Sequence, residues 1–587
     1  MMKMKTNQKD INVLFISPSS MPLYQQEIML AKQSSTLIPK FETPTGLIEL
    51  ASFIRNKLDY VNFQLLDCAK DLFMHHVDIE NKDTTSVYEF YKQELDKVEF
   101  EPQIVGLSVL FSSSYLAVLK ICEYIKERWP NAIVVLGGGH VTFYHNRTLK
   151  DSEHVDYVFI GEAELGLLKF IEHLHDTGKP SANITGVYDR AKVQDAISKG
   201  IRNADFGDLL VELDEIGLPA YDLLDIETYK LHSNAYKAGA IGVMMDRGCP
   251  FKCTYCASMI IHGSSIRTKS NERIKQDLLY LRDECGFKNI VFWDDLLAAK
   301  KSKFMDLSDS LVEENVTDGL LFSMPSGLSV RIMNNNLIDS ITALGFDYVR
   351  IMIESGSEHS QEHLIKKKVD LNKARDLISY TRTKGVKVET NILFGFPGET
   401  KEYMQQTIDY IKTIDVDWIQ VFAALPLPGT EMFHQFASEG IIDPNDIDWD
   451  RCGYSSREFD TDDIKSQELT DLVYDVNIYT NFFGNRNMKQ GRYERAASYF
   501  TNMVLNNYPF HVVGLYMRSM AYKEMGKKDE YLSDLKSASE YIKQSNDARR
   551  LFTRYGSELP ELHEYVDEEI LSSILPNAPS VDAGFRL

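Results

Sequence analysis

The sequence has few cysteines and no long apolar segment, and both absences narrow the kind of protein it can be. Seven cysteines occur among 587 residues, an odd number at too low a density for a disulfide framework. No apolar run approaches the roughly 20 residues that a membrane-spanning helix needs. Residues 1–10 are polar, and the short apolar run at 11–16 is typical of a first β-strand rather than a signal peptide. We therefore expect a cytoplasmic protein without a membrane span.

Positive charge is also scarce. The chain has 64 Lys and Arg against 86 Asp and Glu, a net charge of −22. An acidic surface repels phosphate backbones, and no run of Lys and Arg is long enough to form a basic patch, so we expect no nucleic-acid partner. Hydrophobic residues make up 44% of the chain and charged residues 26%, as in ordinary globular proteins. The length exceeds what one core can hold, which predicts several domains.

The hydrophobic pattern predicts an α/β protein with a helical end. Residues 10–180 alternate short apolar strands with amphipathic helices, which is typical of a doubly wound, Rossmann-like parallel sheet. Residues 181–240 have weaker periodicity and are interpreted as a linker. Residues 241–440 contain six further strands alternating with helices, which predicts a partial (β/α)6 barrel of the TIM type with its chemistry at the carboxyl ends of the strands. Residues 441–587 are predicted to be helical.

The helical end contains a weak internal repeat. The segment that begins at Gly491 recurs in outline at Gly526, 35 residues later. This spacing is similar to that of tetratricopeptide (TPR) repeats. Two interpretations stay open, a helical cap that packs on the barrel and a groove that binds a protein partner.

Three of the seven cysteines lie within eight residues. Cys249, Cys253 and Cys256 follow a predicted strand with the spacing C-x3-C-x2-C. Three thiolates in one loop can hold three irons of a cubane cluster and leave the fourth iron open to a small molecule. A zinc site is one alternative, but zinc sites usually pair two such cysteine units and no second pair occurs here. Structural thiols, the other alternative, do not explain the clustering.

Glycines and polar residues follow the predicted strands of the first domain. The loop Gly137-Gly138-Gly139-His140 directly follows a strand, where glycines let the backbone approach a ligand. Other loops at this sheet edge add five residues that are candidates for binding a ligand. They are Pro44, Thr45, Ser108, Gly161 and Glu162. A doubly wound sheet binds its ligand at such an edge, although a lone histidine there is more often a turn residue.

The cysteine segment resembles the radical S-adenosylmethionine superfamily, which has this spacing and an aromatic residue before the third cysteine. The resemblance continues in later segments at strand ends. It implies that S-adenosylmethionine contacts Tyr255, Asp294 or Asp295, Ser326, Glu354, Ser355 and Gly395. Asp294 and Asp295 stand where the superfamily often has Gly-Gly-Glu.

The first domain resembles the cobalamin-binding domain of the cobalamin-dependent radical S-adenosylmethionine enzymes. That family has Gly-Gly-x-His after the fourth strand and Gly-Glu-x-Glu after the fifth, and both occur here. Many cobalamin proteins also carry Asp-x-His-x-x-Gly, whose histidine binds cobalt. Here the loop begins Asp67-Cys68-Ala69, with His75 and His76 at other spacings. Because the histidine of this motif is missing here, the resemblance implies that cobalt has no histidine nitrogen as its lower axial ligand.

The resemblance implies an enzyme with a [4Fe-4S] cluster, S-adenosyl-L-methionine and cobalamin. We expect a C-methyltransferase that acts on an unactivated carbon through a 5′-deoxyadenosyl radical and methylcobalamin. The alternatives are a cyclase, oxidase or rearrangement enzyme without methyl transfer, and a non-catalytic repeat-bearing interaction protein. We expect a small-molecule, lipid or peptide substrate and an electron donor such as flavodoxin or ferredoxin. No side chain is assigned a catalytic role beyond cofactor binding.

Overall fold

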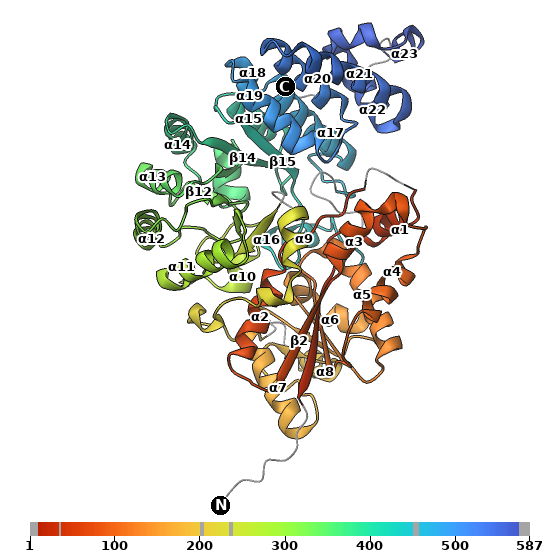
Figure 1. The fold of residues 1–587 in the computed structure, drawn as a ribbon, viewed down its shortest axis with the longest axis vertical. Helices are drawn as coiled ribbons and strands as arrows, with labels where there is room; N and C mark the ends of the chain where they lie inside the picture. Colours follow the sequence, from red (N-terminus) through yellow and green to blue (C-terminus); the bar gives the residue numbers. More distant parts are fainter. Residues whose placement is uncertain (1–9, 34–36, 200–204, 234–238, 450–456, 575–587) are drawn as a thin grey trace, which may run out of the picture. The chain divides into compact units, whose positions relative to one another are not determined.

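The structure is a computed structural model that describes residues 10–33, 37–199, 205–233, 239–449 and 457–574. It divides into two compact units, and each is described by itself (Figure 1). The first unit contains Met1–Leu328, Asn336–Asp347 and Pro426–Gly453. The second contains Ser329–Asn335, Tyr348–Leu425 and Tyr454–Leu587. Over the described residues, no helix is long and apolar enough to cross a membrane.

The first unit opens with the predicted doubly wound sheet. Its strands are β1 (Ile11–Ser17), β2 (Val61–Asp67), β3 (Ile104–Ser108), β4 (Ile133–Gly137), β5 (Tyr157–Phe159) and β6 (Val187–Tyr188). They are ordered β2-β1-β3-β4-β5-β6. The first five are parallel, and β6 is antiparallel to β5. The chain changes direction across the sheet between β1 and β3, which is where such folds bind ligands.

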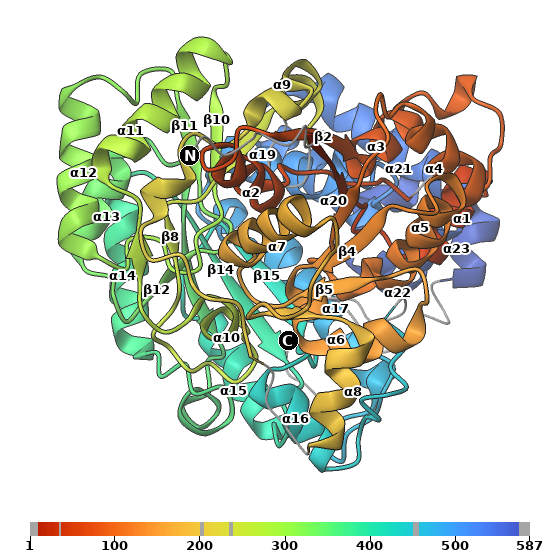
Figure 2. The same cartoon turned by 90° about the horizontal axis from the view of Figure 1, so that it is seen from below.

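Helices cover both faces of this sheet. They are α1 (Leu23–Leu30), α2 (Thr45–Arg55), α3 (Cys68–Val77), α4 (Val87–Asp96), α5 (Tyr115–Arg128), α6 (Gly139–Asp151), α7 (Glu164–Thr177) and α8 (Arg190–Ser198). Alternate strand residues such as Leu14, Ile16 and Leu107 share one core with α3, α4 and α5. Helices α2 and α7 lie side by side on the other face (Figure 2). This two-sided burial explains the continuous apolar strands.

The stretch predicted as a linker carries more structure than its weak periodicity suggested. Strand β6 belongs to the first sheet and is followed by helix α8, and α9 (Ile226–His232) follows two short 3-10 turns. The turns bind α2, since the Ser52 hydroxyl donates to the carbonyls of Ile216 at 2.8 Å and Leu218 at 2.6 Å. The predicted domain limits remain predictions.

The six strands predicted for residues 241–440 all exist and are shared between the units. In the first unit, β7 (Ala240–Val243), β10 (Asn289–Phe292) and β11 (Leu321–Ser323) form a parallel sheet. In the second, β13 (Tyr348–Glu354), β14 (Lys387–Phe394) and β15 (Trp418–Ala423) form another, in a sheet whose first strand is β12 (Leu328–Ser329). The helices among these strands are α10 (Ser258–His262), α11 (Asn271–Leu279), α12 (Lys301–Glu313), α13 (Asn335–Leu344), α14 (Leu371–Thr383), α15 (Lys401–Ile411) and α16 (Glu431–Ser438).

The end of the second unit is helical, as predicted. Its helices are α17 (Ser466–Ile478), α18 (Arg486–Lys489), α19 (Tyr493–Tyr499), α20 (Val512–Glu524), α21 (Lys528–Gln544), α22 (Asn546–Tyr555) and α23 (Glu568–Ile574). They share a hydrophobic core with Trp418 of β15. Trp418 stacks on Tyr499 at 5.8 Å between ring centroids. This helical region is therefore packed into the second unit.

Candidate functional site

The three clustered cysteines lie on a loop closed by a short hairpin. Residues 248–266, here the cysteine loop, join β8 (Asp246–Arg247) to the antiparallel β9 (Arg267–Thr268). Gly248 has a φ of +97°, and a Cβ there would lie 2.5 Å from the Ser265 carbonyl oxygen. The Cys249 amide donates to the Gly263 carbonyl at 3.1 Å. The glycine turn and this bond hold the two ends of the cysteine loop together.

The thiols themselves differ in exposure. Cys249 is buried, whereas Cys253 and Cys256 are partly exposed. Burial, and to a smaller extent the nearby Cys256 and Cys253, raise the pKa of Cys249 to about 11, so the three side chains are within electrostatic reach. No disulfide joins any of the six described cysteines, and Cys452 lies outside the described residues. In the described parts of the chain, no three His, Cys, Asp or Glu side chains are gathered as around a single metal ion.

The two aspartates after β10 hold the start of the cysteine loop. Asp294 is fully buried, and its Oδ1 accepts hydrogen bonds from the amides of Met245, at 2.9 Å, and Asp246. Asp295 Oδ2 accepts from the Gly248 amide at 2.8 Å. Burial and the charge of Asp246 raise the pKa of Asp294 well above its ordinary value. Asp294 Oδ2 has no hydrogen-bond partner among the described residues, so this atom is available to a ligand.

The remaining predicted residues of the first unit are placed less tightly. Tyr255 is partly buried within the cysteine loop. Ser326 is exposed at the tip of a turn in which the Gly327 amide donates to the Met324 carbonyl at 3.0 Å. Gly327 has a φ of +66°, which the turn requires.

Glu354 of the second unit combines a strained backbone with a buried charge. Its φ is +71°, and β13 is irregular in register between Met352 and Glu354. The carboxylate pairs with Lys367 at 2.7 Å and accepts from the Asn391 amide at 2.5 Å. A non-glycine residue in this conformation costs of order 1–3 kcal/mol and is concentrated at functional sites.

Ser355 and Gly395 are structural parts of two adjacent turns in the second unit. The Ser355 hydroxyl lies 3.0 Å from that of Thr407 and accepts from the Ser357 amide at 3.2 Å. Gly395 has a φ of +88°, and a Cβ there would lie 2.6 Å from a Leu469 methyl. Both turns follow the carboxyl ends of their strands, as predicted.

The glycine loop, residues 137–140, follows β4 beside the end of β3. Ser108 pairs in register with Gly137. Gly138 has a φ of +102°, and a Cβ there would lie 2.7 Å from the Val109 carbonyl oxygen. Gly139 begins α6. Pro44 and Thr45 begin α2 in the same unit. The sequence rule that glycines permit close backbone approach therefore holds at Gly138, where the approach is to the neighbouring loop.

His140 is buried with one ring nitrogen free. Its Nδ1 lies 2.9 Å from the Ser112 hydroxyl, and its ring stacks on Tyr144 at 5.0 Å. Burial, and then the charge of Arg147, lower the pKa of His140 to about 3, so the ring is neutral. Nε2 is buried and has no hydrogen-bond partner in the part of the chain that is described.

Gly161 and Glu162 connect the first sheet to the cysteine loop. The Gly161 amide donates to the Thr142 hydroxyl at 3.1 Å. Glu162 is 5% exposed and pairs with Arg267 at 2.5 Å and with His262 at 2.8 Å. Its predicted role as a cofactor contact remains a prediction, but its carboxylate faces Arg267 and His262.

The loop that lacks the cobalt-binding histidine is covered from within the first unit. Tyr229 of α9 is fully buried and donates to Asp67 Oδ2 at 2.5 Å. Asp67 also accepts from the Lys70 amide at 3.3 Å, which caps α3. Burial raises the pKa of Asp67 to about 6. Asp67 thus stands where the histidine motif would begin, directly before α3, and Tyr229 of α9 covers it.

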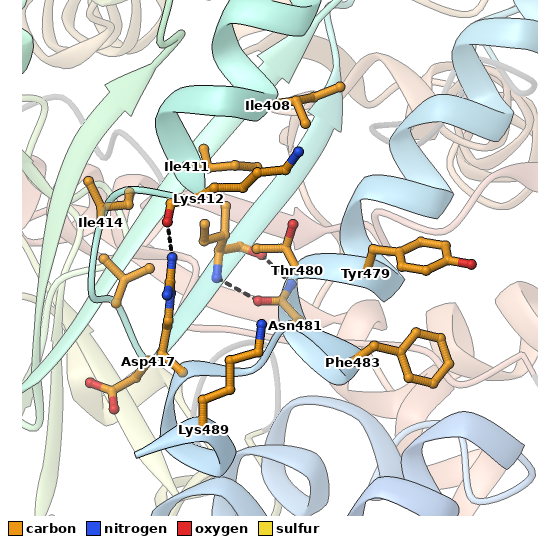
Figure 3. A pocket seen from close by; sticks show the side chains of 14 residues that line it. Ile408, Ile411, Lys412, Ile414, Asp417, Tyr479, Thr480, Asn481, Phe483 and Lys489 are labelled. Carbon is orange, nitrogen blue, oxygen red and sulfur yellow. Dashed lines mark hydrogen bonds between the residues drawn. The ribbon is translucent and has the colours of Figure 1, made fainter. Parts of the chain in front are cut away.

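A separate cavity of about 290 Å³ lies in the second unit (Figure 3). Ile411, Ile414 and Ile419 form apolar walls, and Lys412 and Lys489 also line it. Arg486 is another lining residue, and its guanidinium donates to the Lys412 carbonyl. Several lining residues precede β15, at the amino end of that strand, so the cavity does not belong to the strand ends that carry Glu354 and Gly395.

Arg247, Glu49 and Lys269 were not among the predicted residues. Arg247 lies 2.8 Å from Glu49 and 2.7 Å from Glu164, and Lys269 lies 2.8 Å from Glu49. The one available signal was Glu49, a glutamate at a core-facing position of the otherwise apolar helix α2. Arg247 stands two residues before Cys249 and carried no separate signal.

Comparison with known proteins identifies two regions. Residues 67–170 match the B12 binding domain model and residues 243–411 match the radical SAM superfamily model. An uncharacterised methyltransferase of Pyrococcus horikoshii is 29% identical over 401 residues, which are 68% of this chain and 79% of that protein. The cytidylyl-2-hydroxyethylphosphonate methyltransferase of Streptomyces wedmorensis is 28% identical over 453 residues, 72% of this chain and 83% of that protein.

A solved structure has a similar fold. The cobalamin-dependent S-adenosylmethionine radical enzyme OxsB, with aqua-cobalamin and S-adenosylmethionine bound, aligns with a TM-score of 0.60 at 13% identity. The alignment covers 99% of this chain and 85% of OxsB. At this identity the likeness shows the fold.

Proposed function

This chain belongs to the cobalamin-dependent radical S-adenosylmethionine enzymes, and we propose that it is a C-methyltransferase acting on an unactivated carbon. The observation that carries the proposal is the presence of both cofactor domains in one chain whose relatives at 28–29% identity are named methyltransferases. The family's cofactors are a [4Fe-4S] cluster, S-adenosylmethionine and cobalamin.

The residues present fit these groups. Cys249, Cys253 and Cys256 are thiol donors on one loop, as a cluster with an open iron requires. Asp294 Oδ2, buried and unpaired among the described residues, suits an amino group of S-adenosylmethionine. The buried Nε2 of His140, also unpaired there, suits an amide of the corrin edge. An unsatisfied buried polar atom is costly unless a ligand completes it.

Further residues are assigned to the same cofactors. Toward S-adenosylmethionine these are Tyr255, Asp295, Ser326, Glu354, Ser355 and Gly395. Toward cobalamin these are Pro44, Thr45, Ser108, Gly137, Gly138, Gly139, Gly161 and Glu162. Asp295, Ser355 and Glu162 act through the loops they hold, because their polar atoms bond protein groups.

When bound, the cluster supplies the electron that cleaves S-adenosylmethionine to a 5′-deoxyadenosyl radical, and cobalamin supplies the methyl group. The chain's own contribution is position and exclusion of water. Asp294 and Asp295 fix the amides of Met245 and Gly248 ahead of Cys249. Neutral His140 presents Nε2 without adding charge beside its ligand.

The test uses S-adenosylmethionine with a trideuterated methyl group. Full-length protein, reconstituted anaerobically with iron, sulfide and hydroxocobalamin, is incubated with a low-potential reductant and an extract of cells that lack the gene. We expect 5′-deoxyadenosine and a product that contains the labelled methyl group. Formation of 5′-deoxyadenosine with a changed product but no label would favour the alternative, a radical cyclase, oxidase or rearrangement enzyme. The Cys253→Ala protein is the matched control.

The remaining partners belong to the same proposal. A small-molecule, lipid or peptide substrate and a flavodoxin or ferredoxin as electron donor suit the chemistry. The TPR-like interpretation of the last helices is supported by Gly491 and Gly526, which both have a left-handed backbone, with φ of +71° and +72°, between two helices. We propose that these helices modulate access of the substrate or of a protein partner. The cytoplasmic location also remains a prediction.

A further inference from the structure

The carboxylate of Glu162 bonds both ends of the cysteine loop. Its Oε1 lies 2.8 Å from His262 Nδ1, and its Oε2 accepts from Arg267 Nη1 at 2.7 Å. Arg247, at the other end of the loop, lies 3.4 Å from Oε2. We call Glu162, Arg247, Arg267 and His262 the Glu162 network. All four belong to the first unit.

The hairpin at the base of the cysteine loop depends on this carboxylate. Arg247 and Arg267 are directly opposite each other in the β8–β9 pair, and both are nearly fully buried. Like charges in that position repel, the more so where water is excluded. Glu162 contacts both guanidinium groups, so it offsets a repulsion that would otherwise open the loop.

The surrounding charges complete the network. Glu49 and Glu164 bond Arg247, and Lys269 bonds Glu49. Glu49, Glu162 and Glu164 thus balance Arg247, Arg267 and Lys269. Burial would raise the pKa of Glu162, but the hydrogen bonds of Arg267 and His262 and the charge of Arg247 lower it below its ordinary value. Glu162 is therefore charged at neutral pH.

A continuous chain of bonds leads from the glycine loop to Cys249. The Thr142 hydroxyl donates to the Gly138 carbonyl at 2.9 Å and accepts from the Gly161 amide. Glu162 follows Gly161 and bonds His262. Gly263 follows His262 and accepts from the Cys249 amide. The hydrogen bonds that start at the proposed cobalamin loop and those that start at the cysteine loop therefore meet at Glu162.

We propose that Glu162 is a positioning residue through which the cobalamin site and the cluster site stabilise each other. The proposal rests on the proposed function, because it takes the two loops to be those sites. A cofactor that orders one loop also orders the other through Glu162, so the second cofactor binds to a site that is already ordered. Linkage makes the effect reciprocal.

The test is the dissociation constant of hydroxocobalamin, measured by absorbance on full-length protein with and without its reconstituted cluster. We expect cobalamin to bind the cluster-loaded protein about 5-fold more tightly or better, the lower end of typical couplings. In Glu162→Gln the ratio should fall to about 1 while cobalamin still binds. The control is Glu389→Gln, which neutralises an equally buried glutamate paired with Arg350 in the second unit and should keep the wild-type ratio.

Two milder variants guard against misfolding of Glu162→Gln. Thr142→Val removes the bridge between Gly138 and Gly161 with nearly the same shape, and His262→Leu removes a partly exposed partner. Each should lower the ratio. The inference is overturned if the wild-type protein binds cobalamin equally tightly with and without its cluster. It is also overturned if all three variants keep the ratio of dissociation constants that the wild type shows. Either result leaves the proposed function standing. Loss of all cobalamin binding in Glu162→Gln would make Glu162 a direct contact and also overturn it. Wild-type protein that binds no cobalamin or no cluster would overturn the proposed function as well.

Discussion

Two buried glutamates, each preceded by a glycine at a strand end, behave in opposite ways. Glu162 in the first unit bonds two arginines and a histidine, and its pKa is lowered. Glu399 in the second unit accepts from the amides of Gly395 at 2.7 Å and Phe396 at 3.3 Å. Burial raises the pKa of Glu399 to about 7, more than these bonds and Arg457 lower it. The groups around each carboxylate, and not the preceding glycine, therefore decide whether the glutamate is ionised or is held protonated within a turn.

The largest effect should come from the loop that Glu162 holds. Cys249→Ala, Cys253→Ala or Cys256→Ala should each lose the cluster and all cleavage of S-adenosylmethionine, because two thiolates cannot hold a cubane with one open iron. Iron content and 5′-deoxyadenosine formation measure this. Cys68→Ala and Cys122→Ala, at buried free thiols elsewhere in the first unit, should retain the cluster. Full iron content in Cys253→Ala would refute the assignment.

Removing the cation beside each glutamate should separate the two cases. Arg267→Met removes the closest ion-pair partner of Glu162 and leaves its charged carboxylate buried. The free energy of unfolding should therefore fall by about 3–5 kcal/mol. Arg457→Met removes a bond to the Gly395 carbonyl, but Glu399 can stay protonated, so about 1 kcal/mol is expected. Denaturant titration of both variants measures the difference. Equal losses would show that the two glutamates are in the same state.

The pH dependence should also differ in sign. Glu399 has a folded pKa of about 7, above its ordinary 4.5, so the folded state holds a proton that the unfolded state releases. Protonated Glu399 therefore adds roughly 3 kcal/mol to the free energy of unfolding. This contribution is fully present below about pH 4.5 and is lost as the pH rises through about 7. Glu162, with a lowered pKa, contributes above its unfolded value and loses that contribution as the pH falls below it. Stability measured from pH 5 to 8 should fall less steeply in Glu399→Gln, and an unchanged slope would contradict this assignment.

The smallest effect concerns cobalt. Asp67 begins the segment that elsewhere carries a cobalt-binding histidine, and Tyr229 of α9 donates to it. Nδ1 of His140 is engaged by Ser112, and we assign its Nε2 to an amide of the corrin edge. Electron paramagnetic resonance of bound cob(II)alamin should therefore lack splitting from an axial nitrogen, in wild type and in His140→Ala alike. Nitrogen splitting that disappears in His140→Ala, or in His75→Ala or His76→Ala, would identify a ligand that this account excludes.

The sequence was sufficient for the strands of the two predicted α/β regions and for the chemistry near them, but not for β6, α8 and α9 in the stretch predicted as a linker. The six strands within residues 241–440 were predicted from local apolar runs, and the cysteine spacing lies within one loop. The role of Asp294 toward the Met245 amide depends on a contact 49 residues away, and that of Arg247 toward Glu49 on one 198 residues away. No local pattern encodes such pairs. The same limit applies to Glu399, whose buried carboxylate accepts a hydrogen bond from Ser360, 39 residues away.

The proposed chemistry depends on a cluster with one iron open to S-adenosylmethionine, which electron paramagnetic resonance of the reduced full-length protein can detect. Spectra are recorded on anaerobically reconstituted protein before and after S-adenosylmethionine is added, with Cys256→Ala as the control. We expect a [4Fe-4S] spectrum that changes when S-adenosylmethionine is added to the wild-type protein and that is missing in the variant. A cluster spectrum that S-adenosylmethionine leaves unchanged, or one that persists in Cys256→Ala, would contradict it.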